Sequence, residues 1–523
     1  MKARLPPAWT ARLGALAAGL AAALAHPPFG LILGLLGYGL MMRLAETAGP
    51  RPLRSAFFRG WLAGVGYFGL GVWWVTEAFL VDAAAHGWMA PFALLLLAGG
   101  LALFWGLAAL LYRLARPRGL ARVLVFAGAF SAAEWLRGHV LTGFPWNLPG
   151  EAWIAGGAVS QAAAYVGVYG LTWITVAVAA APALAFDAAP RRARAIAVGL
   201  AALALAGLYG AGAARLAASP NAAPHAPLIR IVQANIDQKD KWKPENLDQI
   251  VADYAALSQR PGAPDLVIWP EGALPAVIDD LVAPGSPYVR RIAAAVPPEG
   301  LLLMGANRVD YAPGGGLDYF NSLVAFGRAG SGLRVAGVYD KHRLVPFGEF
   351  LPFGDLATRL GIRSLVHMPE DFSFGPEPAP LRLPGAPPVQ PLICYEALFP
   401  GFASQAARRA GFRPDWLLNI SNDAWFGATS GPWQHLNLAS YRAIEEGLPI
   451  VRATPTGVSA VIDAQGRIVG ERLELGEAGV VDTRLPPALN PTPYARFGGL
   501  GLALMLLVSA GAALAMRLGR SAF

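Results

Sequence analysis

Long apolar runs, each about the length needed to cross a lipid bilayer, dominate the first 220 and the last 30 residues of this 523-residue chain. A bilayer core about 30 Å thick requires roughly 20 mostly apolar residues per helix. Seven such runs precede residue 220 and one follows residue 490, at approximately 8–25, 28–46, 56–80, 88–112, 120–137, 160–186, 194–216 and 497–516. Only 15% of the residues are charged. The sequence therefore predicts a multi-pass α-helical membrane domain of about eight helices.

In the short segments that connect or flank the apolar runs, Lys and Arg residues fall mainly on one side of the expected path through the bilayer. When successive connecting segments are assigned to alternate sides, one side receives Lys2, Arg4, Arg12, Arg43, Arg51, Arg54, Arg59, Arg113, Arg116, Arg118, Arg191, Arg192, Arg194, Arg517 and Arg520. The segments on the other side, near 82–88 and 137–153, contain only Arg137. Positive charge marks the cytoplasmic side. We therefore expect a protein of the cell inner (cytoplasmic) membrane, with the region between the seventh and eighth runs on the periplasmic side.

The net charge of +8 has the same explanation, because basic residues in short loops are topology signals rather than a nucleic-acid-binding face.

Two other features of the apolar runs admit a second interpretation. The first run resembles a cleaved signal peptide as well as a membrane helix. Glu134, a charged residue inside a run, is either part of a polar floor under a lipid-binding cavity or the ion-pair partner of Arg137.

Residues 227–486 have the pattern of an α/β domain. Short apolar runs, typical of strands buried on both faces, begin at Leu228, Leu266, Leu301, Leu392 and Trp416. Helical stretches at 281–299, 401–412 and 435–446 accompany them. We therefore expect three regions. They are a membrane domain with seven transmembrane helices over 1–220, an extracytoplasmic catalytic domain over 227–486, and a C-terminal transmembrane helix with a cytoplasmic tail over 495–523.

Three polar residues follow buried strands, at the place where α/β folds usually carry their chemistry. They are Glu271 in Trp-Pro-Glu-Gly, Lys341 in Tyr-Asp-Lys-His, and Cys394, the only cysteine, in Ile-Cys-Tyr-Glu. Each alone is equally well explained as a turn residue, a solvated lysine or an inert core thiol. Together they supply a nucleophile, a base for its proton, and a cation that favours the thiolate and holds an oxyanion. No Ser-His-Asp set and no zinc-ligand spacing competes with this combination.

The order and context of these residues resemble the carbon-nitrogen hydrolase (nitrilase) superfamily and, within it, the apolipoprotein N-acyltransferases. The motifs that carry the resemblance are Asn235 with Lys241-Trp242, Trp269-Pro-Glu271, Leu344-Val-Pro-Phe-Gly-Glu349-Phe, Cys394-Tyr-Glu396, Asn419-Ile-Ser-Asn-Asp-Ala-Trp-Phe-Gly427, Gly431-Pro-Trp-Gln-His435 and Arg452-Ala-Thr. The resemblance extends over essentially the whole chain. Two departures, Arg343 in place of a common histidine and Pro455 in place of a frequent asparagine, concern the shape of the pocket rather than the reaction.

The resemblance implies a nitrilase-like α-β-β-α sandwich with Glu271, Lys341 and Cys394 as its catalytic triad. Cys394 would take a fatty acyl group from a phospholipid, typically phosphatidylethanolamine, as a thioester. It would then pass the group to the α-amino group of the N-terminal diacylglyceryl-cysteine of an apolipoprotein. Glu271 is the implied base and Lys341 the implied oxyanion partner. Neither a metal nor a soluble cofactor is implied.

Other motif residues would surround this site. By the same resemblance, the supporting active-site residues are Glu349, Glu396, Tyr395 and Asn321, and the substrate-binding residues are Trp242, Phe350, Trp425, Trp433 and Arg452. Core packing, an interfacial aromatic belt or a plain salt bridge is the alternative for each. For the whole chain, the alternatives are a membrane-tethered nitrilase-type amidohydrolase and a non-enzymatic scaffold or transporter. A tether requires only one helix, and a scaffold would make the triad accidental.

Overall fold

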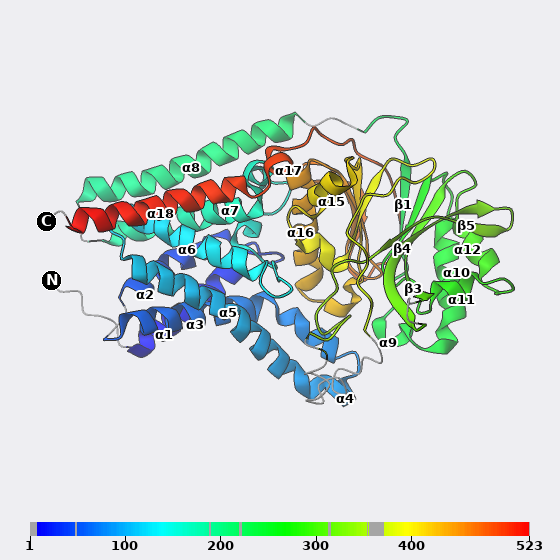
Figure 1. Ribbon diagram of the computed structural model, residues 1–523, viewed down its shortest axis with the longest axis horizontal. Coiled ribbons are helices and arrows are strands. Elements are labelled where there is room, and N and C mark those ends of the chain that lie inside the picture. Colours follow the sequence, from blue (N-terminus) through cyan, green and yellow to red (C-terminus); the bar gives the residue numbers. More distant parts are fainter. Residues whose placement is uncertain are drawn as a thin grey trace. The chain divides into compact units, whose positions relative to one another are not determined.

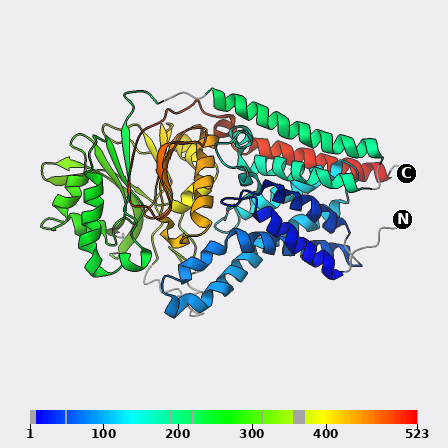
Figure 2. The ribbon, with the colours of Figure 1, turned by 180° about the vertical axis from the view of Figure 1, so that it is seen from behind.

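The computed structural model of the chain divides into two compact units (Figures 1 and 2). The structure describes residues 8–47, 50–187, 190–218, 222–311, 315–352, 354 and 371–521, so Lys2 and Arg4 lie outside the described residues. Unit 1 consists of Met1–Ser219, Thr429–Glu445 and Pro491–Phe523. Unit 2 consists of Pro220–Ala428 and Glu446–Asn490.

Unit 1 is helical, and each of the eight predicted apolar runs contains a helix. The helices matching these runs are α1 (Ala8–Ala23), α2 (Gly37–Glu46), α3 (Pro52–Gly71), α5 (Ala90–Ala115), α6 (Ala121–Arg137), α7 (Ala163–Ala180), α8 (Arg191–Ala217) and α18 (Leu500–Ser521). Shorter helices are α4 (Ala83–His86) and α17 (Pro493–Phe497), and α16 (Gly431–Glu446) comes from the middle of the chain. In both views, α18 runs beside α7 (Figures 1 and 2).

Three helical segments among the described residues are long and apolar enough to cross a membrane. They are Ala83–Ala115, Val159–Phe186 and Arg194–Ala217, and Leu500–Met516 is apolar but shorter. The other predicted runs contain helices that do not meet this length and composition criterion. The structure therefore supports a multi-pass helical membrane region, but the number of spans is supported only roughly.

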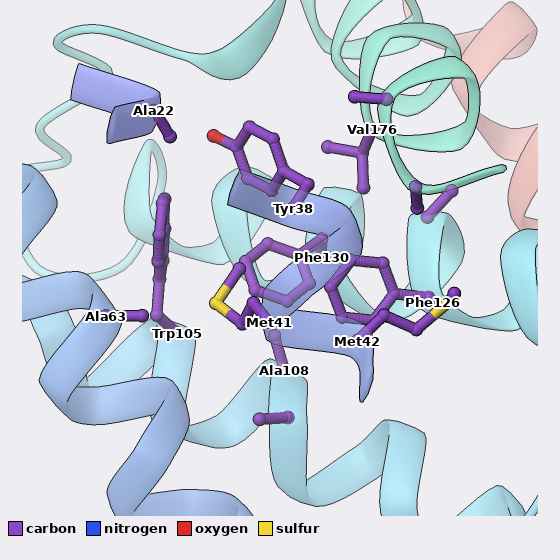
Figure 3. Close-up of a cluster of buried hydrophobic side chains, with 14 of the residues drawn as sticks. Ala22, Tyr38, Met41, Met42, Ala63, Trp105, Ala108, Phe126, Phe130 and Val176 are labelled. Carbon is purple, nitrogen blue, oxygen red and sulfur yellow. The ribbon is translucent and has the colours of Figure 1, made fainter. Parts of the chain in front are cut away.

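The core of unit 1 joins aromatic and small side chains from several of these helices. Tyr38, Trp105, Phe126 and Phe130 are fully buried, and Figure 3 shows them gathered with Met41, Met42 and Val176. The ring of Trp105 packs 5.3 Å from that of Phe130 and 5.6 Å from that of Tyr38, measured between centroids. Such rings bury large apolar areas at fixed geometry.

Glu134 lies within this core and forms an ion pair. Its Oε1 atom accepts a hydrogen bond of 2.6 Å from Trp105 Nε1, and its Oε2 atom pairs with the guanidinium of Arg137, three residues later on α6. Both charged side chains are fully buried. Burial of a charge is costly unless it is paired and hydrogen-bonded, so this pairing accounts for a charged residue inside an apolar run.

Unit 2 contains two β-sheets, with strand orders β11-β1-β2-β3-β4-β5 and β10-β9-β8-β7-β6. The strands are β1 (Leu228–Gln233), β2 (Leu266–Trp269), β3 (Leu301–Tyr311), β4 (Leu317–Ala329), β5 (Gly332–Asp340), β6 (Val389–Ile393), β7 (Trp416–Ile420), β8 (Ile450–Ala453), β9 (Ser459–Ile462), β10 (Ile468–Leu473) and β11 (Gly479–Arg484). Strands β1, β2 and β3 are parallel, as are β6, β7 and β8. Strand β5 runs in the direction of β3, because β4 is antiparallel to both.

Side chains alternate between the two faces of the central strands, and both faces are buried. On β2, Leu266 and Ile268 join an apolar layer that includes Ile393 and Leu418 from the second sheet. Val267 and Trp269 point the other way and pack with residues of α10 (Leu247–Ser258), α11 (Ile278–Val282) and α12 (Val289–Ala295), which Figure 1 shows beside the six-stranded sheet. Because a strand buried on both faces has no polar side, its sequence is a continuous apolar run. Two further α-helices of unit 2 are α9 (Gln238–Lys241) and α15 (Phe402–Ala410).

Helix α16 belongs to unit 1, although its sequence suggested a helical partner for the α/β domain. Polar contacts inside unit 1 explain the difference. Asn437 Nδ2 donates to the carbonyl of Glu151 (2.8 Å), and Gln434 Oε1 accepts from Trp146 Nε1 (2.8 Å). The backbone N–H of Val168 donates to the Glu445 carboxylate (2.7 Å). The amphipathic pattern of a helix shows that one face is buried, but not which element covers it.

Candidate active site

Glu271, Lys341 and Cys394 all follow the carboxyl ends of strands. Glu271 comes two residues after β2, Lys341 directly after β5, and Cys394 directly after β6. The backbone of Glu271 packs against Gly305 on β3, where an added Cβ would lie only 2.4 Å from the Cα atom of Glu271. A side chain at position 305 would therefore displace the turn that carries Glu271.

The carboxylate of Glu271 and the ammonium of Lys341 form a buried ion pair. Lys341 Nζ lies 3.0 Å from Glu271 Oε1 and 2.9 Å from Glu349 Oε1. Asn321 Nδ2 bridges the same two oxygens at 2.6 and 2.7 Å. The other oxygen of Glu271 accepts from the backbone N–H of Asn422 at 2.6 Å. The structure thus brings together four of the predicted site residues in one network.

The contacts in this network determine which of its groups are ionised. Burial acts to raise the pKa of Glu271, but the charge of Lys341 and the hydrogen bonds from Asn321, Lys341 and Asn422 outweigh it and lower that pKa. Burial alone would lower the pKa of Lys341, but Glu271 and Glu349 raise it above its usual value. Both groups are therefore ionised at neutral pH.

The thiol of Cys394 lies within the electrostatic influence of both charges. Burial raises the pKa of this thiol well above its usual range, and the Glu271 carboxylate adds to the effect. The charge of Lys341 and a hydrogen bond with Ser421 act in the opposite direction without overcoming it. The resting thiol is therefore protonated.

The backbone at Cys394 adopts a left-handed conformation with φ 47°. Such a conformation costs a residue other than glycine roughly 1–3 kcal/mol and persists only where its surroundings enforce it. Here Cys394 begins the short 3₁₀ helix Cys394–Leu398 directly after β6. The side chain that this turn carries packs against the apolar layer shared by the two sheets.

Glu396 enforces this turn. Its Oε2 atom accepts from the backbone N–H of Ile393 at 2.8 Å. Its Oε1 atom accepts from Tyr339 Oη at 3.0 Å and from the backbone N–H groups of His342 and Arg343 at 2.8 and 3.2 Å. Burial raises the pKa of Glu396 to about 7, although these donors act to lower it. One carboxylate thus ties the turn bearing Cys394 to the segment bearing Lys341.

Replacing Glu396 with glutamine is expected to loosen that tie. A glutamine has one acceptor oxygen, so its NH₂ group must face the N–H of Ile393 or the three donors at the other end. A buried donor left without an acceptor costs about 1–3 kcal/mol. We expect a lower unfolding temperature and faster alkylation of Cys394 in Glu396→Gln. Glu377→Gln, at an exposed glutamate, is the control, and equal behaviour of the two variants would contradict the role assigned to Glu396.

Arg452 is fully buried and binds the protein itself. Its two terminal nitrogens contact the side chains of Asn419 and Asp423. Asp423 in turn accepts a hydrogen bond of 2.7 Å from Ser421 Oγ, the hydroxyl that contacts Cys394. Arg452 is therefore connected to the thiol of Cys394 through Asp423 and Ser421.

The aromatic candidates lie in different places. Tyr395 is buried, with its ring 5.1 Å from that of Phe399, and Phe350 is half-buried beside Phe374 at 5.2 Å. Trp242 and Trp425 are 52% and 41% exposed. All four belong to unit 2, whereas the fifth, Trp433, lies on α16 in unit 1. Exposed indole rings are available to a ligand in a way that packed rings are not.

The two departures from the family pattern have identifiable contacts. The guanidinium of Arg343 lies 4.0 Å from the ring centroid of Phe399, a cation–π arrangement. The carbonyl of Pro455 accepts a hydrogen bond of 2.9 Å from the backbone N–H of Asn235. This contact uses only main-chain atoms, so it does not depend on the side chain at position 455.

Sequence reasoning did not assign roles to Ser421, Asn422 and Lys241. Ser421 and Asn422 directly follow β7, so the strand-end criterion applied to Glu271 and Cys394 would have selected them as well. Lys241 is 2% exposed and lies near the Glu271 carboxylate, which acts on its pKa. Its sequence, Gln-Lys-Asp-Lys-Trp, is typical of a solvated turn and gives no signal of burial.

Comparisons with known proteins agree along the full length of the chain. Residues 18–181 match the apolipoprotein N-acyltransferase N-terminal domain, and residues 228–490 match the carbon-nitrogen hydrolase family. The chain is 56% identical to the apolipoprotein N-acyltransferase of Caulobacter vibrioides, covering 98% of this chain and 96% of that protein. It is 40% identical to that of Rhodopseudomonas palustris, covering 95% and 94%.

Among solved structures, a crystal structure of an amidase from Nesterenkonia sp. is similar at 20% identity and a TM-score of 0.35, covering 54% of this chain and 97% of the amidase. The two family models and the relatives, which cover almost all of the sequence, give the assignment. The chain belongs to the apolipoprotein N-acyltransferase family.

Proposed function

We propose that this chain transfers a fatty acyl group from phosphatidylethanolamine to the α-amino group of the N-terminal diacylglyceryl-cysteine of apolipoproteins, through a thioester on Cys394. The observation that carries the proposal is the cluster of Glu271, Lys341 and Cys394 at adjoining strand ends, in a chain that matches apolipoprotein N-acyltransferases over 98% of its length. This match favours acyl transfer over hydrolysis of a small amide by a tethered enzyme.

In the first half-reaction, the sulfur of Cys394 attacks the carbonyl carbon of the donor ester. Because the resting thiol is protonated, its proton passes to Glu271 as the carbon–sulfur bond forms. The tetrahedral intermediate then collapses and breaks the bond to the glycerol oxygen. Glu271 returns the proton to that oxygen, and the lysophospholipid leaves. Glu271 Oε2 accepts only the N–H of Asn422 among the described contacts, so this oxygen retains capacity for the thiol proton.

Lys341 stabilises the negative charge that develops on the carbonyl oxygen. An ammonium group has three N–H donors, and two of those on Lys341 are directed at Glu271 and Glu349. Within the part of the chain that the structure describes, no residue accepts the third. A donor that is already oriented needs no reorganisation when the oxyanion forms. The carboxylate of Glu349 and the amide of Asn321 keep the ammonium in place.

In the second half-reaction, the neutral α-amino group of the acceptor attacks the thioester. Glu271 accepts the proton that the amine loses, and the carbon–sulfur bond breaks to release the Cys394 thiolate. The proton on Glu271 then returns to the sulfur, which restores the resting site. The product is an amide, which is more stable than the thioester, so the transfer proceeds toward acylated lipoprotein.

A membrane-embedded chain suits these substrates, because both carry acyl chains that prefer lipid to water. Trp242, Phe350, Trp425 and Trp433 are the aromatic residues that we assign to substrate binding, and the exposure of Trp242 and Trp425 supports this assignment. Arg452 contributes by positioning Asp423, in view of its buried contacts.

The catalytic unit lies on the periplasmic side of the cell inner membrane in this proposal. The basis is the alternation of Lys and Arg residues between loops. A reporter inserted at Gly330, in the exposed turn between β4 and β5, is expected to be active outside the cytoplasm, and the same reporter after Phe523 only inside. The opposite pattern at either position would overturn the orientation.

The reaction is tested by separating its two halves. Purified protein incubated with phosphatidylethanolamine is expected to gain one acyl group that hydroxylamine removes. Addition of a diacylglyceryl-cysteine peptide should then move that group to the peptide's amine. Release of free fatty acid with no acylated peptide would instead identify a hydrolase, and no acyl-protein at all would refute the thioester route.

A further inference from the structure

Lys241 is a buried ammonium group without a counter-ion among the residues that the structure describes. It ends the short helix α9 and is 2% exposed. Its Nζ atom has no hydrogen-bond partner among the described residues, and no described carboxylate forms a salt bridge with it. The acidic residues beside it are engaged elsewhere, since Asp237 accepts from Lys239 N and Asp240 accepts from Lys243 Nζ.

The ammonium of Lys241 lies beside the catalytic turn. Gly272 follows Glu271 with φ +56°, and a Cβ built on it would lie 3.0 Å from Lys241 Nζ and 3.9 Å from Asn422 Nδ2. The negative charge of Glu271 acts to raise the pKa of Lys241. A glycine at position 272 therefore allows Lys241 to approach the turn closely, next to the carboxylate proposed as the base.

Two further side chains next to Lys241 or Gly272 have unsatisfied polar atoms. Gln238, three residues before Lys241 and so on the same face of α9, is 5% exposed, and both polar atoms of its side chain lack partners among the described residues. The Oδ1 atom of Asn422 is also buried without a partner. Buried polar groups are normally hydrogen-bonded, and each exception calls for an explanation.

A ligand anion would satisfy the two donors in this set, Lys241 Nζ and the Gln238 NH₂ group, whereas the amide oxygens of Gln238 and Asn422 are acceptors and need a different partner. An isolated buried ammonium is unfavourable, and burial lowers the pKa of Lys241 to about 8 despite the nearby Glu271. An anion bound at Nζ would restore the charged form, and the amide NH₂ of Gln238 would donate to a second oxygen. A phosphate group, with several acceptor oxygens and a full negative charge, matches this donor set.

We infer that Lys241 and Gln238 form a subsite for the phosphodiester of the phospholipid donor, adjoining the catalytic turn at Glu271 and Gly272. This inference rests on the proposed function, because it names the part of the donor that is recognised. The phosphate of a diacyl phospholipid is attached to the same glycerol as its acyl esters, so one molecule can reach both Lys241 and Cys394. The subsite thus distinguishes phospholipids from lipids without a phosphate before the ester is attacked.

The same charge distinguishes the two substrates of the reaction. A diacylglyceryl-cysteine acceptor has no phosphate, and its amino group is cationic before it reacts. Lys241 therefore favours the donor and repels a protonated acceptor amine. The subsite contributes to forming the thioester and not to discharging it.

The inference is tested by comparing donors with and without phosphate in the full-length protein. The rate of thioester formation is measured with phosphatidylethanolamine and with a diacylglycerol carrying the same acyl chains. In Lys241→Met we expect the phospholipid rate to fall about 10- to 100-fold, the typical effect of removing a charged hydrogen-bond donor. The diacylglycerol rate should change little. Lys243→Met, at an exposed lysine two residues away, is the control and should match the wild type.

Binding is measured separately with lipids that cannot react. A diether phospholipid lacks the ester, so it occupies the donor site without acylating Cys394. Its inhibition constant should rise about 10-fold or more in Lys241→Met, whereas that of a diether glycerol without phosphate should stay the same. Inorganic phosphate at equal concentration should inhibit the wild type much less than the diether phospholipid does.

Several outcomes would overturn the inference. Equal slowing of phospholipid and diacylglycerol in Lys241→Met would show that Lys241 only supports Glu271. An unchanged phospholipid rate, or inhibition by inorganic phosphate as strong as that by the diether phospholipid, would exclude a headgroup subsite. Absence of a thioester in the wild type with either donor would refute the proposed function itself, which separates that failure from the failure of the subsite.

Discussion

Replacing Cys394 with alanine is expected to reduce acyl transfer below detection while leaving the fold intact. The thiol is the proposed carrier of the acyl chain, so its removal should eliminate the covalent intermediate rather than weaken it. The loss of one small side chain should cost only about 1 kcal/mol of stability. The unfolding temperature and the acylated-peptide yield are measured on the same preparation.

The matched variant Cys394→Ser separates the nucleophile from the shape of the turn. Serine restores the size of the side chain but provides a far less acidic hydroxyl, so it should also be inactive or nearly so. Because Cys394 is the only cysteine in the chain, every acyl group released from the wild type as a thioester must come from it. Acylated peptide formed by the alanine variant would show that another residue carries the acyl group.

Glu271→Gln and Lys341→Met are both expected to block thioester formation at neutral pH, but to respond differently to alkaline pH. In Glu271→Gln the proposed base is lost, and so is a negative charge that raises the pKa of the Cys394 thiol. The thiol pKa should therefore fall, and raising the pH should restore part of the thiolate and part of the acylation. The oxyanion partner Lys341 is still present in this variant.

In Lys341→Met the expected change in the pKa of the Cys394 thiol has the opposite sign. Loss of the cation removes an influence that lowers the thiol pKa, so the thiolate becomes harder to form at any pH. The oxyanion also loses its donor, which typically costs on the order of 100- to 1000-fold in rate. Little rescue is expected at alkaline pH.

Thioester yield measured against pH in both variants decides between these assignments. Thermal unfolding serves as the control, because Lys341→Met leaves the carboxylates of Glu271 and Glu349 close together without their shared cation. Equal rescue of the two variants would show that the roles of base and oxyanion partner are wrongly divided. Rescue of Lys341→Met alone would require the roles assigned to the two residues to be exchanged.

Uniform burial made several strands predictable, although β8 and β9, which are also buried throughout, were not predicted. Strands β1, β2 and β7 lie where continuous apolar runs indicated them, because both of their faces are covered. The strand expected before Lys341 is β5, but it is not buried as expected, and β10 was not predicted. Many of their residues are exposed or half-buried, so their sequences lack both the apolar run and a clean alternation.

The same limit applies to the candidate site. Position at a strand end predicted that Glu271, Lys341 and Cys394 share one region, and the structure gathers their side chains, while their catalytic roles stay predictions. Contacts made by main-chain groups were not predictable. The N–H of Asn422 on Glu271 and the left-handed turn at Cys394 depend on how separate segments meet. Lys241 was missed because the sequence does not show which lysines become buried.

The place of helix α16 constrains the order in which the protein can be completed during synthesis. The chain passes from unit 1 to unit 2 after Ser219, returns for Thr429–Glu445, leaves again, and comes back for Pro491–Phe523. One apolar cluster of unit 1 combines Val168 with Tyr441, Ile444 and Leu502, and Val168 is made hundreds of positions before the other three. Unit 1 therefore stays unfinished until nearly the whole of unit 2 has emerged from the ribosome. Contacts so distant in sequence form slowly, and a ribosome that stops early leaves an open membrane bundle rather than a finished half of the enzyme.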